Sequence, residues 1–401
     1  MNNLKKDTFT QVKSFQEKLL GLKKSLLWWV TAELTERCNF NCRHCYINRP
    51  AGDQLARQQE LKTEEWKEFL QEAASLGCLT VRFTGGEPLL REDFEEIYQF
   101  TRRLGMRVSL STNASLITSP LAALFKKIPP LEEIEITIYG LSERTYEEVT
   151  RVVGSYQAVQ AGLAYLRENK IRFSLRGIVL PATLPELDRF KKWAQEMDAS
   201  GAPPALVFSL DLRARRDSEQ RNQEIARLRL PPEKYVQLIA QERELYNQTM
   251  KEFVHRFLGP RGTKLFTCGA GQGIAALDSY GQLQPCLLLR HPRLVYPWRQ
   301  ERNLKKAMMD FFPSLREMEA ENDEYLKKCA RCFISGLCEQ CPARSWMESG
   351  TLDTPIDYYC QVAHAQARQL GLLSPGEKGW QVKDWSRRLK KVENLLTSGV
   401  K

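Results

Sequence analysis

The chain of 401 residues lacks the features that would direct it to a membrane or to the secretory pathway. Its first residues, Met1 to Lys24, carry scattered lysines and no continuous apolar stretch, so they do not resemble a signal peptide. The most apolar early segment, Leu26 to Val30, is far too short to span a bilayer. We therefore predict a cytoplasmic protein that does not act on a membrane.

Cysteine is missing from about 190 consecutive residues in the middle of the chain, although the chain has 11 cysteines in total. Three cysteines lie between residues 38 and 45, one is Cys78, and seven lie between residues 268 and 360. Disulfides are rare in the cytoplasm, and a disulfide framework is not usually segregated in this way. The distribution predicts metal sites in two separate modules, with Cys78 as a small core residue.

A concentrated basic patch is also missing. The net charge is +10, but lysine and arginine are spread along the chain, so we predict no nucleic-acid partner. The positive charge suits an acidic partner, or it is simply a solvated basic surface.

Short apolar, β-branched runs alternate with amphipathic helical stretches over the first half of the chain. Such alternation predicts an α/β fold with a parallel sheet of right-handed crossover units. The pattern alone leaves open a partial barrel or an open doubly wound sheet. The six predicted strands are Leu27–Leu34, Leu79–Thr84, Arg107–Ser111, Glu133–Tyr139, Ile171–Leu180 and Ala205–Leu210.

Changes in composition divide the chain into five predicted parts. Residues 263–365 are rich in glycine, cysteine and proline, so bound metal can replace a large apolar core there. The parts are an N-terminal extension (1–26), the strand–helix repeat (27–212), a charged helical bridge (213–262), the cysteine-rich domain (263–365) and a basic helical tail (366–401).

The first cysteine group directly follows the first predicted strand. Cys38, Cys42 and Cys45 have C-x3-C-x2-C spacing, which lets one short loop place three thiolates around a [4Fe–4S] cube. Three protein ligands leave one iron open to the amine and carboxylate of an amino acid. The alternative is a zinc ion with His44 as fourth ligand, but this spacing is too tight for four tetrahedral corners.

This motif resembles that of the radical S-adenosylmethionine (SAM) superfamily. The family has an aromatic residue directly before the third cysteine, and His44 occupies that position here. The resemblance implies a partial (β/α)6 barrel of the TIM type and a SAM cofactor, with Cys38, Cys42 and Cys45 as the catalytic cluster ligands. Segments after later strands resemble the family's SAM contacts. By position, the predicted SAM-binding residues are His44, Gly85, Gly86, Glu87, Pro88, Ser111, Asn113 and Arg176.

The positions of these residues agree with that reading. Cys38, Glu87, Asn113 and Tyr139 follow the carboxyl ends of predicted strands, where barrels build active sites. Gly85 and Gly86 have no side chains and would let the backbone approach a ligand, and Glu87 could accept hydrogen bonds from an ammonium group. Alone, this Gly-Gly-Glu-Pro segment would be only a strand-to-helix turn.

The seven C-terminal cysteines resemble a SPASM domain, a module that holds auxiliary iron–sulfur clusters. Five residues between the two C-x2-C pairs are too few for a zinc ribbon, and seven thiolates suit two clusters. The resemblance implies one [4Fe–4S] cluster on Cys329, Cys332, Cys338 and Cys360, and another on Cys268, Cys286 and Cys341. The second cluster has an open iron or an unrecognised fourth ligand. Cys338 and Cys341 have two residues between them, where the family more often has three.

These resemblances imply an enzyme that cleaves SAM to a 5′-deoxyadenosyl radical and modifies a ribosomally made peptide. Residues 135–146 resemble maturases that form thioether or carbon–carbon links. The implied partners are the peptide or protein substrate, an electron donor such as flavodoxin or ferredoxin, and a separate leader-peptide-binding protein. The alternatives are a maturase of sulfatases, quinone cofactors or haem, and a non-catalytic electron-transfer protein.

Overall fold

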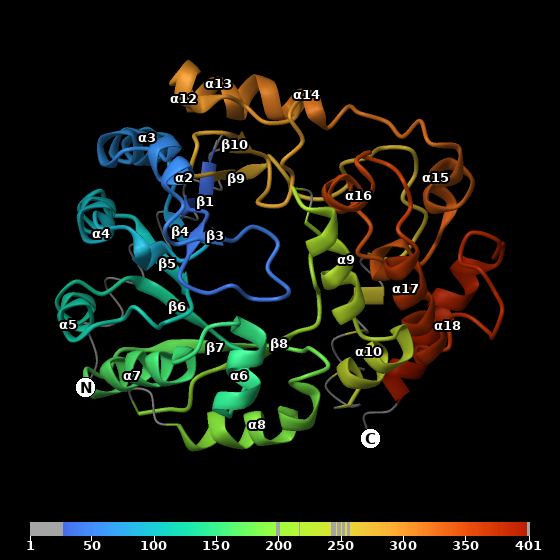
Figure 1. Ribbon diagram of the computed structural model, residues 1–401. Coiled ribbons are helices and arrows are strands. Elements are labelled where there is room, and N and C mark those ends of the chain that lie inside the picture. The colour runs from blue at the N-terminus through green and yellow to red at the C-terminus, as the bar shows by residue number, and fades with distance from the viewer. Residues whose placement is uncertain are drawn as a thin grey trace, which may run out of the picture. The chain divides into compact units, whose positions relative to one another are not determined.

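The computed structural model describes residues 27–197, 201–215, 217–241, 246, 250, 253–254 and 257–398. The predicted N-terminal extension therefore lies outside the described residues. The chain, drawn in Figure 1, divides into two compact units. Unit 1 comprises residues 1–209 and 269–313, and unit 2 comprises residues 210–268 and 314–401. The domain boundaries inferred from composition stay predictions.

An eight-stranded, mostly parallel sheet forms the centre of unit 1, which confirms the predicted α/β class of the radical SAM partial barrels. Its order is β10-β9-β1-β4-β5-β6-β7-β8. All six predicted strands are present and run parallel to their neighbours. They are β1 (Leu27–Thr35), β4 (Thr80–Gly85), β5 (Arg107–Thr112), β6 (Leu131–Ile138), β7 (Phe173–Ile178) and β8 (Leu206–Ser209).

Two strands from the cysteine-rich segment extend the sheet beyond β1. Strand β9 (Gly273–Leu277) pairs with β1 in parallel, and β10 (Leu283–Gln284) pairs with β9 antiparallel. The sequence did not predict them, because five residues beginning with glycine and a two-residue strand give too short a periodic pattern. A separate ribbon joins β2 (Arg37–Cys38) to β3 (Arg49–Pro50) at the two ends of the first cysteine loop.

The two faces of the sheet differ in polarity because side chains alternate along each strand. Val30, Ala32 and Leu34 are fully buried, and Ala32 pairs with Phe83, whose ring meets Phe94 of α4 at 6.1 Å between centroids. This apolar face therefore packs against the helices, which Figure 1 shows side by side along the sheet. Hydroxyl and charged side chains line the other face: Thr31, Glu33, Arg82, Thr84, Ser109, Ser111, Glu135, Ser174 and Arg176.

The helices of unit 1 have the amphipathic pattern that packing on such a sheet requires. In α3, for example, Trp66, Phe69 and Leu70 are fully buried at helical spacing. The helices and helical turns are α2 (Gln54–Gln59), α3 (Thr63–Ser75), η1 (Pro88–Leu90), α4 (Phe94–Arg103), α5 (Ser119–Lys127), α6 (Glu143–Thr150), α7 (Ser155–Glu168), η2 (Leu184–Glu186), α8 (Leu187–Glu196), α12 (Trp298–Glu301), α13 (Leu304–Lys306) and η3 (Ala307–Phe311).

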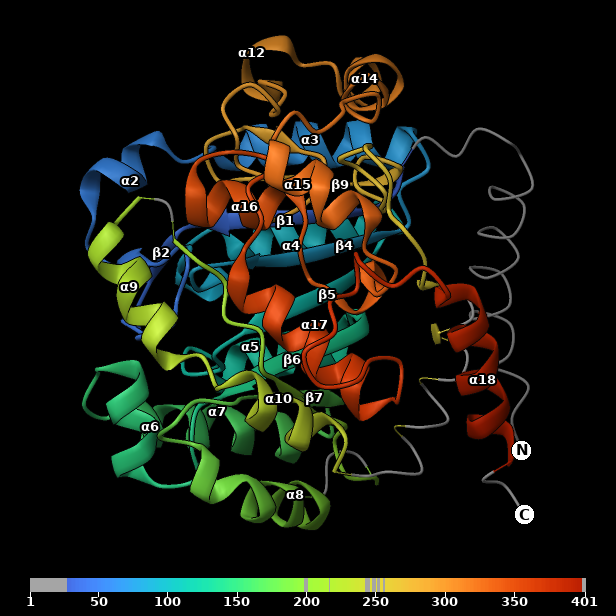
Figure 2. The ribbon, with the colours of Figure 1, turned by 90° about the vertical axis from the view of Figure 1, so that its right-hand side faces the viewer.

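Unit 2 is mainly helical. Figure 2 shows α10 beside α17, and a small apolar core that includes Phe333, Ile334 and Leu372 lies in this unit. No helix among the described residues is long and apolar enough to cross a membrane. The remaining elements are α9 (Glu219–Leu228), α10 (Pro232–Ile239), α14 (Phe312–Leu315), α15 (Asp323–Lys327), η4 (Cys329–Arg331), η5 (Ser335–Leu337), α16 (Pro342–Ser349), α17 (Asp357–Gln369) and α18 (Trp385–Ser398).

Candidate functional site

The first cysteine loop leaves the carboxyl end of β1 and is fixed at both ends. The backbone N–H of Arg49 donates to the carbonyl oxygen of Glu36 at 2.8 Å, which closes the loop at its base. Its middle is fixed to α6, since Asn41 and Arg43 donate backbone hydrogen bonds to Thr150 and Val149 at 2.9 and 3.1 Å. Backbone hydrogen bonds therefore fix the base and the middle of the loop.

The three thiols of this loop lie close enough to affect one another. Burial raises the pKa of the Cys38 thiol, and the neighbouring Glu87, Cys42 and Cys45 raise it further. The neutral thiol of Cys38 is thus favoured in the chain alone, and metal binding at this residue would release its proton. A single loop with three neighbouring thiols suits one [4Fe–4S] cluster, so the donor set fits the predicted cofactor.

Gly85 and Gly86 pack against the backbone that leads into this loop. Gly86 N–H donates to Thr35 O at 2.7 Å, and Glu87 N–H donates to Arg37 O at 2.9 Å. A Cβ added at Gly86 would lie 2.5 Å from the carbonyl oxygen of Glu36 and 2.7 Å from the carbonyl carbon of Arg37. The glycines thus permit a close approach of two backbone segments, and their contact with SAM stays a prediction.

Glu87 joins the ends of two strands. Its carboxylate is fully buried and accepts hydrogen bonds from Thr112 Oγ1 and from the backbone N–H of Asn113, both at 2.8 Å, and from Leu89 N–H at 3.1 Å. Burial raises the pKa of Glu87 to about 7, while these hydrogen bonds lower it. The side chain of Asn113 in turn reaches Cys38 Sγ at 3.9 Å and Asn39 Oδ1 at 3.0 Å. Glu87 and Asn113 therefore connect the third strand end to the cysteine loop.

Two other predicted residues lie on the polar face of the sheet. Ser111 pairs in register with Glu135, and Arg176 forms an ion pair with Glu135 at 2.5 Å. Of the remaining predicted residues, Pro88 begins η1 directly after Glu87, and the His44 ring lies 5.4 Å from that of Tyr139. Burial, and then the thiols of the first loop, raise the pKa of Tyr139. The structure thus brings most of the predicted site residues together at one end of the strands, and their roles toward SAM stay predictions.

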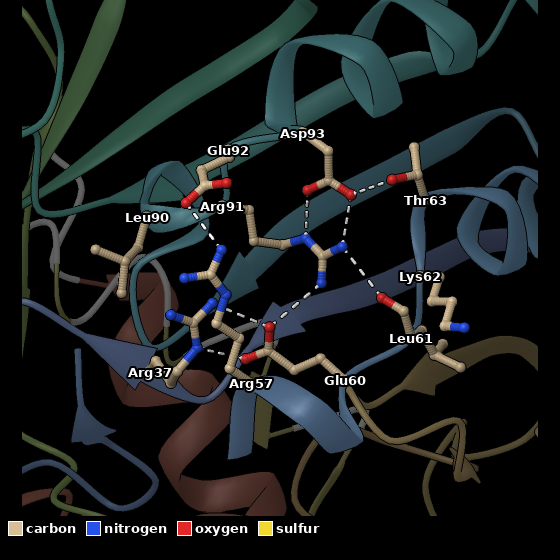
Figure 3. A pocket seen from close by; sticks show the side chains of 10 residues that line it. All are labelled: Arg37, Arg57, Glu60, Leu61, Lys62, Thr63, Leu90, Arg91, Glu92 and Asp93. Carbon is tan, nitrogen blue, oxygen red and sulfur yellow. Dashed lines mark hydrogen bonds and ion pairs between the residues drawn. The ribbon is translucent and has the colours of Figure 1, made fainter. Parts of the chain in front are cut away.

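A buried ion network supports the base of the loop (Figure 3). A cavity of about 310 Å³ is lined by residues 37, 57, 60–63 and 90–93. Within it, Glu60 accepts hydrogen bonds from Arg37 at 2.9 and 3.1 Å, from Arg91 at 3.5 Å and from Thr35. Arg91 also donates to the carbonyl oxygens of Leu34 and Leu61, both at 3.1 Å. Since Arg37 immediately precedes Cys38, this network orients the first ligand of the loop.

Arg290 forms a second network that the sequence did not predict. Its guanidinium donates to Glu33 and, at 2.6 Å, to Glu36, and Tyr280 donates to the same Glu36 carboxylate at 2.9 Å. Burial raises the pKa of Glu33 to about 7, and the positive charge of Arg290 lowers it. Arg290 lies four residues after Cys286, so it connects that cysteine segment to the polar end of β1. No local pattern indicates this pairing, because the partners are more than 250 residues apart.

Four of the seven C-terminal thiols line one cavity in unit 2. Cys329, Cys332, Cys338 and Cys360 surround a space of about 290 Å³. Burial raises the pKa of Cys332 and Cys338 to about 12, and the neighbouring thiols contribute in both cases. Four mutually close thiols suit a fully ligated [4Fe–4S] cluster, so this donor set fits the predicted auxiliary cofactor.

The other predicted auxiliary ligands are divided between the units, with Cys286 in unit 1 and Cys268 and Cys341 in unit 2. Burial raises the pKa of the thiol of Cys341, the N-cap residue of α16, and the Cys268 thiol adds to this rise. Cys78 lies in the core with 3% exposure, as predicted.

In the part of the chain that the structure describes, no three His, Cys, Asp or Glu side chains converge on a point that could hold one metal ion. The thiolates of a [4Fe–4S] cube need no such point, since each binds a different iron.

Comparison with known proteins places this architecture. Residues 32–194 match the model of the radical SAM superfamily. A curated relative from Methanosarcina barkeri named "AdoMet-dependent heme synthase" is 29% identical over 334 residues, covering 79% of this chain and 92% of the relative. A relative of the same name from Oleidesulfovibrio alaskensis is 25% identical and covers 80% of this chain and 83% of its own length. The Methanosarcina barkeri "Fe-coproporphyrin III synthase" is 33% identical over 154 residues, 38% of this chain and 37% of the relative.

Solved structures show the same fold. The anSMEcpe protein with bound AdoMet has a TM-score of 0.60 at 16% identity and covers 92% of this chain and all of its own. Streptococcus suis SuiB bound to S-adenosylmethionine has a TM-score of 0.58 at 15% identity, covering 90% of this chain and 81% of its own. At these identities the likeness shows the fold alone, and the SPASM assignment of the cysteine-rich part stays a prediction.

Proposed function

Since residues 32–194 of this chain are a radical SAM domain, and the chain is a radical SAM enzyme that uses SAM, we propose that its substrate is an iron tetrapyrrole. This function is the haem-type alternative from the sequence, and it replaces peptide modification as the leading hypothesis. The observation that carries it is the extent of the likeness to the proteins named haem synthases. That likeness covers about four fifths of this chain, whereas the radical SAM model covers about two fifths. It therefore extends well beyond the common radical machinery.

The charge of the chain supports the same substrate class. A net charge of +10 favours association with a polyanion, and the side-chain carboxylates of a porphyrin make it one. Fe-coproporphyrin III differs from haem in having propionates at two positions where haem has vinyl groups. Converting one propionate to one vinyl group removes one hydrogen atom, one electron and one CO₂. A radical abstraction at the propionate followed by loss of an electron therefore balances the conversion.

The chain's own residues would divide this task between two regions. The first region would hold the cluster at which SAM binds, on Cys38, Cys42 and Cys45. The cluster and its bound SAM would together supply a 5′-deoxyadenosyl radical. Glu87 and Asn113 fix the rim of the site, because they connect two strand ends to the cysteine loop. The four thiols of the 290 Å³ cavity would hold a cluster suited to one-electron transfer.

The test is an anaerobic assay of the iron-loaded chain with SAM, a reductant and Fe-coproporphyrin III. We expect haem and two molecules of 5′-deoxyadenosine for each haem formed, measured by liquid chromatography and mass spectrometry. A Cys38→Ala, Cys42→Ala, Cys45→Ala variant serves as control and should form neither product. Formation of 5′-deoxyadenosine with no change of the porphyrin would refute the substrate proposal and leave the radical chemistry intact.

Peptide modification is the second candidate. It derives from the resemblance of residues 135–146 to peptide maturases, and one structural neighbour is SuiB bound to the precursor peptide SuiA. At 16% identity this neighbour shows the fold alone. A parallel arm of the assay with cysteine-containing peptides would favour this candidate if only the peptide increased 5′-deoxyadenosine formation.

A further inference from the structure

A histidine lies beside one of the four thiols of the unit 2 cavity. His364 follows Cys360 by four residues on α17, and residues at this spacing share a helix face. The His364 side chain is almost fully buried and lines the cavity together with the four cysteines. Its Nδ1 atom lies 2.7 Å from the carbonyl oxygen of Cys360 and 3.6 Å from Cys360 Sγ.

The hydrogen bond at the other ring nitrogen assigns the proton. The backbone N–H of Gly379 donates to His364 Nε2 at 3.0 Å, so this nitrogen is an acceptor and carries no proton. In a neutral imidazole the proton then resides on Nδ1. The only ring N–H of His364 therefore points at Cys360, toward both its carbonyl oxygen and its sulfur.

Gly379 connects this histidine to a second cluster ligand. Its carbonyl oxygen accepts a hydrogen bond from Phe333 N–H at 3.3 Å, next to Cys332. A Cβ added at Gly379 would lie 2.7 Å from Cys332 Sγ and 2.8 Å from Ile334 Cγ1, so there is no room for a larger residue. One ring thus connects the helix that carries Cys360 to the segment that packs on the Cys332 sulfur.

We propose that His364 is a positioning residue for the auxiliary cluster, with its Nδ1–H donating to the cluster-bound sulfur of Cys360. The proposal rests on the cluster assigned to Cys329, Cys332, Cys338 and Cys360. A metal-bound thiolate carries more negative charge than a thiol, so the 3.6 Å contact becomes a charge-assisted hydrogen bond. Hydrogen bonds to cluster sulfurs are one of the determinants of reduction potential. Because reduction adds negative charge to the cluster, this donor raises its potential.

The experiment uses the full chain with iron–sulfur clusters reconstituted, in the Cys38→Ala, Cys42→Ala, Cys45→Ala background. This background removes the radical cluster signal. His364→Leu removes both hydrogen bonds of the ring, whereas His364→Asn keeps a donor near the position of Nδ1. Trp380→Phe is the matched packing control, because the Trp380 ring lies 5.3 Å from that of His364 and lines the same cavity. Iron is counted for each chain, and midpoint potentials are obtained by redox titration followed by electron paramagnetic resonance.

We expect His364→Leu to shift one auxiliary midpoint potential to a more negative value, while His364→Asn and Trp380→Phe stay close to the parent. Loss of about four irons from each chain in His364→Leu alone would also support a role of His364 in positioning the cluster. Unchanged iron and potentials in His364→Leu, or equal losses in all three variants, would overturn the role of Nδ1.

A second measurement separates this proposal from its premise. Replacing the four cavity cysteines by alanine must remove about four irons for each chain. If it removes none, the cluster assignment is wrong and the histidine role falls with it. Neither measurement uses a porphyrin, so the outcome does not depend on the substrate.

Discussion

Replacing Gly86 by alanine tests whether the Gly-Gly-Glu-Pro segment acts first as a backbone contact. The added Cβ would lie 2.5 Å from the carbonyl oxygen of Glu36, well inside the separation of ordinary non-bonded atoms, about 3.5 Å. A movement of about 1 Å is therefore needed. It cannot be local, because Gly86 and Glu87 donate backbone hydrogen bonds to Thr35 and Arg37 at 2.7 and 2.9 Å. The strand end and the cysteine loop must separate together.

Overpacking of this kind costs about 1–3 kcal/mol, and a contact made entirely with backbone belongs at the upper end. At roughly 2–4 °C for each kcal/mol, we expect Gly86→Ala to unfold about 4–12 °C below the wild type in thermal melts followed by circular dichroism. Since Arg37 precedes Cys38, the displaced loop should also bind less iron. A displacement of about 1 Å at reacting groups reduces the rate about 100-fold, which we expect for 5′-deoxyadenosine formation.

Gly52→Ala is the matched control, because nothing lies within 4 Å of the position of its added Cβ. It should melt within a degree or two of the wild type and keep its iron. If Gly86→Ala behaved like Gly52→Ala in both measurements, the close backbone contact would not be what requires glycine at position 86. The requirement would then have to come from a ligand, and SAM affinity would be the quantity to compare.

Three further predictions concern buried charges. Burial raises the pKa of Glu87 from 4.5 to about 7, so the folded chain binds this proton more tightly than the unfolded chain, and stability falls as the pH rises from 4.5 to 7. Glu87→Gln should remove up to about 1.4 kcal/mol for each pH unit of this slope, measured by urea unfolding across that range. Arg290→Gln should destabilise the chain by about 3–5 kcal/mol by leaving Glu33 buried without its partner, and adding Glu33→Gln should recover part of the loss in the urea midpoint. Glu60→Ala should cost a similar amount, and it should lower iron content as well, because Glu60 holds Arg37 beside the first cysteine.

The strands and the first half of the site could be predicted because their signals are local. A run such as Leu27–Thr35 has the apolar and β-branched residues of a buried strand, and the loop that begins at Cys38 follows it at once. In a parallel sheet the carboxyl ends of all strands meet at one edge, so residues such as Glu87 and Asn113 are brought together by topology. The sequence therefore predicted where these residues meet, and the structure adds that they bond to each other.

The contacts that support the site could not be predicted in this way. Arg290 meets Glu33 and Glu36 only because β9 and β10 fold back beside β1, and those strands are too short to have a periodic pattern. The role of Glu87 toward SAM stays a prediction. What the sequence did not indicate is its burial, which is possible because Thr112 and the backbone of Asn113 and Leu89 supply three donors that replace water.

The pair of Cys360 and His364 lies between these two cases. Its i and i+4 spacing is visible in the sequence, and a helix places both residues on one face, so proximity was open to prediction. The direction of the ring proton was not, because it depends on Gly379, whose N–H occupies the other nitrogen. Gly379 lies 15 residues later in the chain, beyond the end of α17, and has no motif of its own. The sequence spacing therefore identifies Cys360 as a candidate cluster ligand and His364 as its neighbour on the helix. The backbone donor that fixes the tautomer is what turns that neighbour into a hydrogen-bond donor to the cluster.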